Sequence, residues 1–432
     1  MKAKSLAYEE KLESLLARSG IDRLDAQHQQ FLRQRSLEFR FTQQQLRQLS
    51  DIAVDLVMWG EQPLYEIWPE IDVDKLDPKQ RRQRLLQTIH YHWRQLQQAP
   101  KRYPPIPVAA GQDVQRIRRI ETEKHKLALG PCPVASPRTR CCNLMTLDAV
   151  ENCGFDCSYC SIQSFYHGDE VRFDRQFAEK LATLEIDPER IYHIGTGQSS
   201  DSLMWGNHGG ILDALLDFAQ RHPNVILELK SKSKNVNHLM KVDLPPNLLC
   251  TWSLNTPTLI AHEERLTASL EDRLKAARRL ADRGALVGFH FHPMIHYADW
   301  QEDYGALFQQ LTKQFSADEV VQVSLGTLTY IKPVIKRLRT RSGFRSKILQ
   351  MPMVECDGKL SYPQSIKEEM FRFAYRSLQS WHDDVFFYLC MENQRLWQPV
   401  FGYDYPSNQA FEEAMKQAYL KKICNRGKRD GQ

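Results

Sequence analysis

Apolar segments that alternate with amphipathic segments constrain the fold of this chain more than any other feature. Six candidate strands lie at 144–150, 191–194, 225–229, 248–254, 286–292 and 320–325. Candidate helices lie between them at 174–185, 208–221, 234–241, 269–283 and 301–315. A strand followed by a helix, repeated along the chain, requires a parallel sheet with right-handed crossovers. Six such units predict an α/β fold, a partial (β/α)6 barrel with its chemistry at the carboxyl ends of the strands.

The flanking regions carry a different pattern. Residues 1–110 are polar and helical in period, with helices expected at about 43–59 and 78–98. The proline-rich stretch 99–107 predicts a boundary after them. We therefore expect an N-terminal helical extension at 1–110, the barrel at 111–330, and a small C-terminal α+β region at 331–432. In that last region, 347–354 and 385–389 read as strands, and 366–378 and 408–423 read as helices.

Composition sets limits on location and partners. The 432 residues include 58 Lys and Arg against 53 Asp and Glu, so any nucleic-acid footprint has to be local. The first residues are charged and lack the apolar stretch of a signal peptide. No apolar run is long enough to cross a membrane. The ten cysteines are scattered outside one cluster, unlike a disulfide framework. We expect a cytoplasmic protein without a membrane partner.

The cysteine cluster follows the first predicted strand. Cys153, Cys157 and Cys160 form a C-x3-C-x2-C pattern within eight residues. A cuboidal iron–sulfur cluster normally takes four thiolate ligands. Three thiols this close in sequence can hold one cluster and leave one iron open to a substrate or cofactor. The pattern therefore predicts a catalytic iron–sulfur centre.

Two other interpretations of these thiols stay open. A structural zinc site usually needs four ligands, and the nearest other thiols, Cys141 and Cys142, do not repeat the pair spacing. A redox C-x2-C motif carries two cysteines beside a helix start, not three. A non-catalytic zinc or redox module is thus the alternative to a cluster enzyme.

Further polar residues follow other predicted strands. Gly195–Asp201 is a stretch of small and polar residues that allows close approach of a ligand to the backbone. Lys232 offers a charge for a carboxylate, and Ser253 offers a hydroxyl. His290 and His292 lie two apart on one strand, so both point to one face. We interpret them as polar lining of the barrel mouth, with a metal pair as the alternative.

These segments together resemble one branch of the radical S-adenosylmethionine (radical SAM) superfamily, the spore photoproduct lyases and DNA repair photolyase-like proteins. The segments that carry the resemblance are NCGFDCSYC, GTGQSSDSL, LELKSKSKNV, WSLNTPTLIAHEERLTASLEDRLKAA, VGFHFHPMIHYADWQEDYGALF, VSLGT, KIL…DGKLSY and YLCME. They run in order through about 60% of the chain, from about residue 145 to 402, and leave residues 1–110 largely outside.

The resemblance implies a [4Fe–4S] cluster on Cys153, Cys157 and Cys160, with S-adenosylmethionine (SAM) bound to the open iron. It implies reductive cleavage of SAM to a 5′-deoxyadenosyl radical, with electrons from a donor such as flavodoxin or ferredoxin. By motif position, the SAM contacts would be Ser200, Lys232 and Ser253, and Tyr159 would be a radical-relay tyrosine in the cysteine loop. The substrate would be a pyrimidine lesion in DNA, or RNA, and the reaction a C–C bond lysis.

Two positions depart from the family pattern. The family's hydrogen-donor cysteine is matched here by Gln198, and a second tyrosine after the last cluster cysteine is matched by Ser161. An amide does not give up a hydrogen atom as a thiol does. A radical SAM enzyme that modifies a small molecule or peptide therefore remains the alternative to nucleic acid. The basic stretches 335–347 and 421–429 favour the nucleic-acid substrate.

Overall fold

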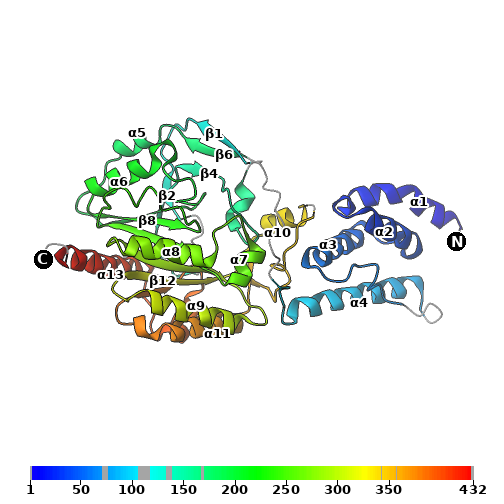
Figure 1. Cartoon of the computed structure of the whole chain (residues 1–432). Helices are drawn as coiled ribbons and strands as arrows, with labels where there is room; N and C mark the ends of the chain where they lie inside the picture. The colour runs from blue at the N-terminus through cyan, green and yellow to red at the C-terminus, as the bar shows by residue number, and fades with distance from the viewer. Residues whose placement is uncertain are drawn as a thin grey trace. The chain divides into compact units, whose positions relative to one another are not determined.

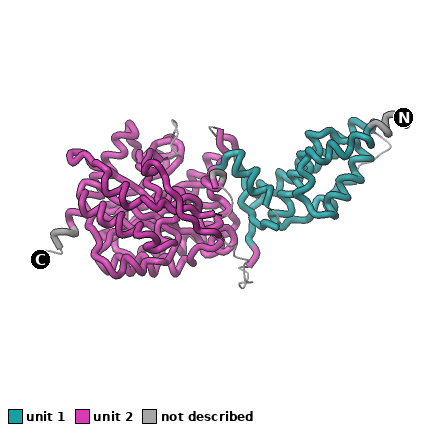
Figure 2. Tube along the Cα trace, turned by 90° about the horizontal axis from the view of Figure 1, so that it is seen from above, with its two compact units in different colours: residues 1–103, 330–353 teal, residues 104–329, 354–432 magenta. Residues whose placement is uncertain are grey.

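The computed structural model describes residues 2–70, 76–105, 117–132, 139–166, 170–341, 343–356 and 358–429 (Figure 1). The chain divides into two compact units (Figure 2). Unit 1 comprises residues 1–103 and 330–353, and unit 2 comprises 104–329 and 354–432. The three-part division expected from the sequence remains a proposal. Its first boundary, at residue 110, lies outside the described residues, and residues 331–353 group with the N-terminal helices instead of with the C-terminal region.

Unit 1 is helical. Its helices are α1 (Lys2–Ala17), η1 (Ile21–Arg23), α2 (Ala26–Phe39), α3 (Gln43–Trp59), α4 (Pro78–Gln98) and α10 (Lys332–Arg339). Both helices expected in the first hundred residues, α3 and α4, are confirmed. Each begins with a capping box, at Thr42 and at Asp77, in which side chains satisfy backbone N–H groups that the helix cannot.

A buried carboxylate on α3 joins two other helices of unit 1. Asp55 accepts hydrogen bonds from the Arg339 guanidinium on α10 at 2.8 and 2.7 Å. It also accepts one from the Trp93 indole on α4 at 3.1 Å. Burial raises the pKa of Asp55, and the charge of Arg339 opposes that rise. Residues 332–339 are thereby fixed to the N-terminal helices by an ion pair that spans more than half of the sequence.

Unit 2 contains an eight-stranded sheet in the order β16-β12-β11-β9-β8-β7-β3-β2. The six predicted strands form β3 (Met145–Leu147), β7 (Tyr192–Thr196), β8 (Val225–Ser231), β9 (Leu248–Ser253), β11 (Leu286–Met294) and β12 (Val320–Thr327). Neighbours among these six pair in parallel. The sheet curls into a half barrel with helices on its outside (Figure 1), which confirms the predicted fold class.

Two more strands extend the sheet beyond the six. The segment expected as a C-terminal strand is β16 (Phe386–Leu389), which pairs in parallel with β12. At the other edge, β2 (Leu129–Pro131) pairs antiparallel with β3. The first predicted strand is shorter than expected, because the chain leaves the sheet at Asp148. The next strand, β4 (Val150–Glu151), joins a separate sheet, in which β6 (Glu170–Asp174) lies between β4 and β1 (Arg118–Thr122).

Most predicted helices of unit 2 are confirmed. They are α5 (Phe177–Ala182), α6 (Ile211–Arg221, after η3, His208–Gly210), α8 (Leu270–Ala281), α9 (Trp300–Gln314), α11 (Gln364–Ser377) and α13 (Asn408–Arg429). The structure adds α7 (Pro257–Glu263), α12 (Trp397–Phe401), η2 (Ser161–Phe165), η4 (Gln379–Trp381) and η5 (Gln394–Leu396). The remaining short strands are β5 (Asp156–Cys157), β10 (Glu264–Arg265), β13 (Thr329–Tyr330), β14 (Val354–Cys356) and β15 (Lys359–Ser361).

Two predictions of secondary structure are wrong. The expected helix at 234–241 is a series of turns, since Ser231 and Ser233 bind backbone N–H groups two residues ahead and stabilise a turn. The expected strand at 347–354 is a turn and bend over residues 348–351, where the Ser346 hydroxyl accepts from the backbone N–H of Ile348 at 3.1 Å. Hydrogen bonds of this kind, from side chains to nearby backbone groups, stabilise a turn more than a short apolar segment favours a strand or helix.

The inner face of the barrel carries a buried polar network. Glu228 on β8 accepts hydrogen bonds from His193 (2.8 Å), His290 (2.7 Å) and Thr251 (2.7 Å). Burial alone would raise the pKa of Glu228, but the histidines hold it well below its usual value. The carboxylate is thus fixed by donors from three other strands, as buried charge requires.

Within the described residues, no helix is both long and apolar enough to cross a membrane.

Substituting Asp55→Ala leaves the Arg339 guanidinium and the Trp93 N–H without their partner. Removing one member of a buried pair costs about 3 kcal/mol. We expect the urea midpoint of unit 1, followed by tryptophan fluorescence, to fall accordingly. The control is Glu13→Ala on α1, whose exposed carboxylate pairs only with the exposed Arg33 among the described residues; its loss should cost about 1 kcal/mol or less. Equal losses for the two variants would contradict the assigned role of Asp55.

Candidate functional site

The cysteine loop lies just beyond the carboxyl end of β3, where a parallel barrel places its chemistry. Part of the loop forms the two-residue strand β5, which pairs antiparallel with β10. This pairing sets Cys157 opposite Glu264. The backbone N–H of Ser158 donates to the carbonyl of Glu263 at 2.9 Å, and the Ser158 hydroxyl donates to the Glu263 carboxylate. The loop is therefore held by the segment that follows α7.

The three thiols of the loop are free and lie within electrostatic reach of one another. Cys157 is buried, and Cys153 and Cys160 are partly exposed. Burial raises the pKa of Cys153 to about 12, and the Asp201 carboxyl adds to the rise. Burial also raises the pKa of Cys157 well above its usual value, with Lys232 opposing. Cations at this site would favour the thiolate forms that iron requires.

Among the residues that the structure describes, no three His, Cys, Asp or Glu side chains are gathered tightly enough to share a single metal ion. A cuboidal cluster does not require such a gathering, because each thiolate binds a different iron. Three free thiols from one loop, with a lysine beside them, are a donor set that fits this cluster.

Tyr159 is anchored by a buried ion pair. Its hydroxyl donates to the Glu264 carboxylate, and the Arg273 guanidinium donates to the same carboxylate at 2.5 Å. Burial and then the charge of Glu264 raise the pKa of Tyr159 well above its usual value, so the phenol stays protonated. Burial acts to raise the pKa of Glu264, but Arg273 brings it below the usual value. The ring of the predicted relay tyrosine is thus fixed in one place.

The indole ring of Trp205 connects Ser200 to the cysteine loop. The Trp205 N–H donates to the Ser200 hydroxyl at 3.1 Å. The same indole packs on Gly154, where a Cβ atom would meet the Met204 side chain at 2.3 Å and Trp205 at 2.9 Å. Only glycine fits at position 154 without displacing these side chains. The backbone of the cysteine loop at Gly154 therefore packs directly against side chains of the segment that follows β7.

Asp201 organises the strand end that carries Lys232. Its carboxylate accepts from the backbone N–H of Lys232 at 2.6 Å and from the Ser231 hydroxyl at 2.8 Å. Burial raises the pKa of Asp201, and the Lys232 N–H opposes that rise. The Lys232 ammonium lies 5.8 Å from the centre of the Tyr159 ring, close enough for a cation–π contact. The structure thus brings the predicted lysine to the cysteine loop.

Ser253 is buried at the end of β9, and its carbonyl accepts from Arg273 at 2.8 Å. It joins the site through the guanidinium that also holds Glu264. Glu264 and Arg273 therefore connect Ser253 to the cysteine loop that carries Cys157 and Tyr159. Lys232 joins the same site through its contact with the Tyr159 ring. Our sequence analysis missed Glu264, Arg273 and Asp201 as site residues, although the first two lie in the segment HEERLTASLEDRLKAA that carries the resemblance.

The two histidines of β11 belong to the barrel interior. His290 is held by Glu228 and by the Ser324 hydroxyl at 2.6 Å, and burial lowers its pKa to about 4. Nε2 of His292 is buried and has no hydrogen-bond partner within the described part of the chain. The ring centres of the two histidines lie 5.5 Å apart. With His290 engaged in the network of Glu228, the pair is better described as polar lining than as a metal pair.

A second group of thiols includes two, Cys132 and Cys390, that act electrostatically on Lys230 near the end of β8. Its members, which act electrostatically on one another, are Cys132, Cys141, Cys142 and Cys390. A hydrogen bond from Cys142 lowers the pKa of Cys141 to about 6, whereas burial raises that of Cys390 to about 12. From the sequence, we considered Cys141 and Cys142 only as possible neighbours of the cysteine loop. Nothing in the sequence indicates that Cys390, which follows β16, lies near them.

Gln198 and Ser161, the two residues that depart from the family pattern, both lie near the cysteine loop in sequence or in the fold. Gln198 lies in the loop after β7, where the next residue, Ser199, donates its backbone N–H to Asp148 at 3.0 Å. Ser161 begins η2. The hydroxyl of Tyr166, just after η2, lies 3.7 Å from the sulfur of Cys160. A tyrosine therefore does approach the last loop thiol, from a position that the sequence motif does not indicate.

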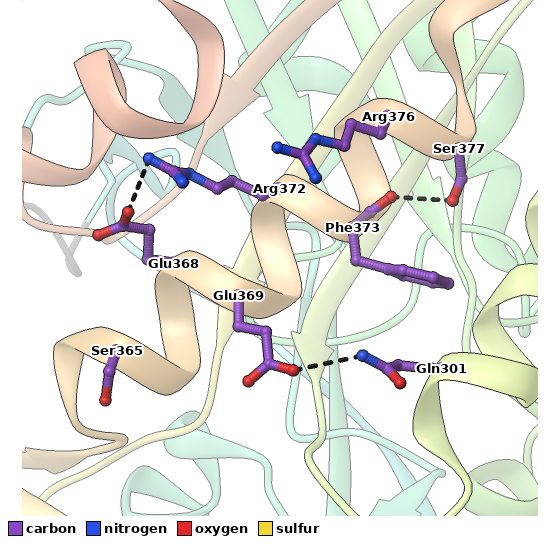
Figure 3. A pocket seen from close by; sticks show the side chains of 8 residues that line it. All are labelled: Gln301, Ser365, Glu368, Glu369, Arg372, Phe373, Arg376 and Ser377. Carbon is purple, nitrogen blue, oxygen red and sulfur yellow. Dashed lines mark hydrogen bonds and ion pairs between the residues drawn. The ribbon is translucent and has the colours of Figure 1, made fainter.

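A separate open pocket of about 670 Å3 lies along α9 and α11 (Figure 3). Its polar walls include the ion pair of Glu368 with Arg372 at 2.8 Å and the hydrogen bond of Gln301 to Glu369 at 3.3 Å. None of the residues predicted from the sequence lines it. We do not assign it to the candidate site.

Comparison with known proteins gives one consistent result. A family model described as "Spore photoproduct lyase" matches residues 151–350. A spore photoproduct lyase of Clostridium acetobutylicum is 23% identical over 181 residues, which cover 40% of this chain and 53% of the relative. One from a Geobacillus species is 26% identical over 183 residues, covering 41% and 52%. The chain thus spans about half the length of the curated relatives it matches.

Solved structures agree at the level of the fold. A spore photoproduct lyase mutant with bound AdoMet and dinucleoside spore photoproduct superposes with a TM-score of 0.52 at 18% identity, covering 67% of this chain and 88% of that one. A second mutant of that enzyme gives 0.53 with the same coverage. These matches confirm the resemblance to the spore photoproduct lyase branch. The family match begins in the cysteine region and leaves residues 1–150 outside.

Replacing Glu264→Gln removes the charge that compensates the buried guanidinium of Arg273. We expect a loss of about 3 kcal/mol in the stability of unit 2, measured as a lower urea midpoint. The matched control is Glu271→Gln on α8, which breaks only the exposed pair with Lys275 and should cost less than about 1 kcal/mol. An unchanged midpoint for Glu264→Gln would show that the pair does not hold the loop.

Proposed function

We propose that this chain is a radical SAM enzyme of the spore photoproduct lyase type, with a [4Fe–4S] cluster on Cys153, Cys157 and Cys160. The observation that carries this proposal is the position of the cysteine loop. Three free thiols follow the first strand of a half barrel, at the strand ends where Lys232, Ser253 and Tyr159 also lie. The family match over residues 151–350 supports it.

A [4Fe–4S] cluster held by these thiols would supply the electron for reductive cleavage of SAM to methionine and a 5′-deoxyadenosyl radical. The residues of this chain bind and orient the reactants. Lys232 offers its ammonium to the carboxylate of SAM, and Ser200 and Ser253 offer hydroxyl groups. Glu264 and Arg273 fix the loop and hold the phenolic proton of Tyr159. Burial of these groups keeps water from a reactive centre.

We propose a pyrimidine lesion in nucleic acid as the substrate. Support comes from the relatives, whose names and bound dinucleoside spore photoproduct describe lesion repair in those proteins. The partner in electron transfer would be a small donor protein such as flavodoxin or ferredoxin. We place the enzyme in the cytoplasm, a reducing compartment in which its ten free cysteines would stay reduced.

One observation favours a second substrate class. Gln198 stands where the family carries a hydrogen-donor thiol, so the last step of lesion reversal lacks its usual donor. A small molecule or peptide that needs no thiol would fit that position equally well.

Anaerobic incubation with SAM, dithionite and dinucleoside spore photoproduct distinguishes a nucleic-acid lesion from a small molecule or peptide as the substrate. Lesion repair predicts that 5′-deoxyadenosine appears together with a dinucleoside in which both pyrimidines are separate, as read by mass spectrometry. Formation of 5′-deoxyadenosine with an intact lesion would leave the radical chemistry standing and reject the lesion as substrate.

Cys157→Ala should abolish the cluster, because two remaining thiolates are too few to hold it. We expect iron to fall from about four atoms per chain to near zero after anaerobic reconstitution, with loss of 5′-deoxyadenosine production. The control is Cys424→Ala, an exposed thiol on α13 that should leave iron content unchanged. Full iron content in Cys157→Ala would refute the ligand assignment.

Lys232→Ala should weaken SAM binding while the cluster stays. A charge-assisted hydrogen bond is worth about 1.5–3 kcal/mol, which corresponds to a Kd raised by roughly tenfold or more. Calorimetric titration of the reconstituted protein measures this change. Lys234→Ala, two residues on, removes an exposed lysine that pairs with Asp272 at 3.0 Å and serves as the control. Equal affinities in the two variants would show that another lysine binds SAM.

A further inference from the structure

Charge is divided unevenly between the two units. Residues 1–103 and 330–353 contain 24 Lys and Arg against 14 Asp and Glu, a net charge of +10. The rest of the chain contains 34 against 39, a net charge of −5. The mild excess of the whole protein therefore hides a strongly basic unit joined to an acidic one. An attraction for polyanions has its source in unit 1.

Within unit 1, the positive charge is concentrated in two segments without acidic residues. Helix α4 carries Lys79, Arg81, Arg82, Arg84 and Arg94 and no Asp or Glu. Residues 330–353, which include α10, carry seven Lys and Arg and again no Asp or Glu. A helix on an ordinary solvated surface carries mixed charges, so two acid-free segments in one unit indicate a surface built for an anionic partner.

The buried carboxylate of Asp55 holds these two segments together. It binds Arg339 of α10 and Trp93 of α4, so the segments meet at one residue of α3. Asp55 neutralises only Arg339, which is largely buried. The neighbouring Arg94 on α4 and Lys336 on α10 remain directed to solvent.

Four cations on these helices are exposed and available. Lys332 and Lys336 lie one turn apart on α10, and Arg84 and Arg94 lie on the exposed face of α4. In the described part of the chain none of the four forms an ion pair. Between the two arginines, Tyr91 exposes 65% of its surface, which is unusual for a large aromatic side chain. Exposed cations beside an exposed aromatic ring suit phosphates and the sugars or bases between them.

Burial and, to a smaller extent, neighbouring cations lower the pKa of two basic groups in unit 1. Burial, together with the charge of Lys347, lowers the pKa of Lys101 to about 7. Burial and the charge of Arg94 lower the pKa of His90. Acidic groups do face this region, because Glu61 pairs with Lys347 at 2.9 Å, but they leave the four exposed cations uncompensated.

We propose that unit 1 is a docking module for duplex DNA, which binds the phosphate backbone through Lys332, Lys336, Arg84 and Arg94. The proposal rests on the nucleic-acid substrate proposed above and names the surface that recruits it. Residues 1–103, which contribute Arg84 and Arg94, lie outside the family match, whereas residues 330–350, which contribute Lys332 and Lys336, lie inside it. Binding through phosphates gives affinity without sequence preference, as a search for rare lesions requires.

The test measures binding of the reconstituted full chain to an undamaged 30-base-pair duplex by fluorescence anisotropy across salt concentrations. Each phosphate contact contributes about 0.9 to the slope of log K against log salt. Lys332→Gln with Lys336→Gln should reduce that slope by about 2, and two lost contacts of about 0.9 log units each should weaken binding by roughly 60-fold at about 0.1 M salt. Arg84→Gln with Arg94→Gln should do the same.

The matched control is Lys241→Gln with Lys313→Gln, which removes the same charge from exposed positions of unit 2 that precede β9 and β12. It should leave the slope unchanged. The proposal is overturned if the control weakens binding as much as the unit 1 pairs do, if the wild-type chain does not bind the duplex, or if it binds anionic vesicles and not DNA.

The same variants separate this proposal from the proposed function. Dinucleoside spore photoproduct has no flanking duplex for unit 1 to bind, so its turnover should be equal in wild type and in both unit 1 pairs. Turnover of the dinucleoside without any duplex binding overturns the docking proposal alone. Duplex binding with the expected slopes, but without turnover, supports docking and rejects the lesion as substrate.

Discussion

The candidate site depends on one buried carboxylate. Glu264 accepts from Tyr159 in the cysteine loop, from Arg273 on α8 and from Asn255 after β9. Asn255 and Arg273 each lie nine residues from Glu264 in sequence, whereas Tyr159 lies 105 residues away and meets it only in the folded barrel. A buried charge is stable only when such donors surround it, so movement of the loop would deprive Glu264 of the Tyr159 hydroxyl, one of its three donors. The geometry of the loop thiols follows from this constraint.

The same principle operates at two other places in the molecule. Glu228 gathers donors from three strands inside the barrel, and Asp55 gathers two helices in unit 1. Each is a buried acid that joins separate elements. Hydrophobic burial supplies the bulk of the stability, whereas these carboxylates select one arrangement of the elements. The proposed docking surface is a consequence of the arrangement around Asp55, since that carboxylate brings α4 and α10 together.

The order of strands and helices, and the position of the cysteine loop after the first strand, could be predicted from the sequence. Strongly apolar segments such as 225–229 and 320–325 pair where the pattern predicts, because burial on both faces leaves them no other stable place. The predictions failed at 234–241 and 347–354, where serine side chains bind nearby backbone groups and stabilise turns. Local hydrogen bonds of this kind are weakly marked in a hydrophobic pattern.

The sequence by itself determined the barrel class, the three loop thiols and the lysine at the third strand end, since these depend on local spacing and periodicity. Only the tertiary structure decided that Glu264 and Arg273 hold the loop, that Cys390 joins Cys141 and Cys142 near Lys230, and that residues 330–353 pack with the N-terminal helices. Those outcomes depend on long-range contacts between charges and thiols. No local pattern records which distant partner satisfies a buried group.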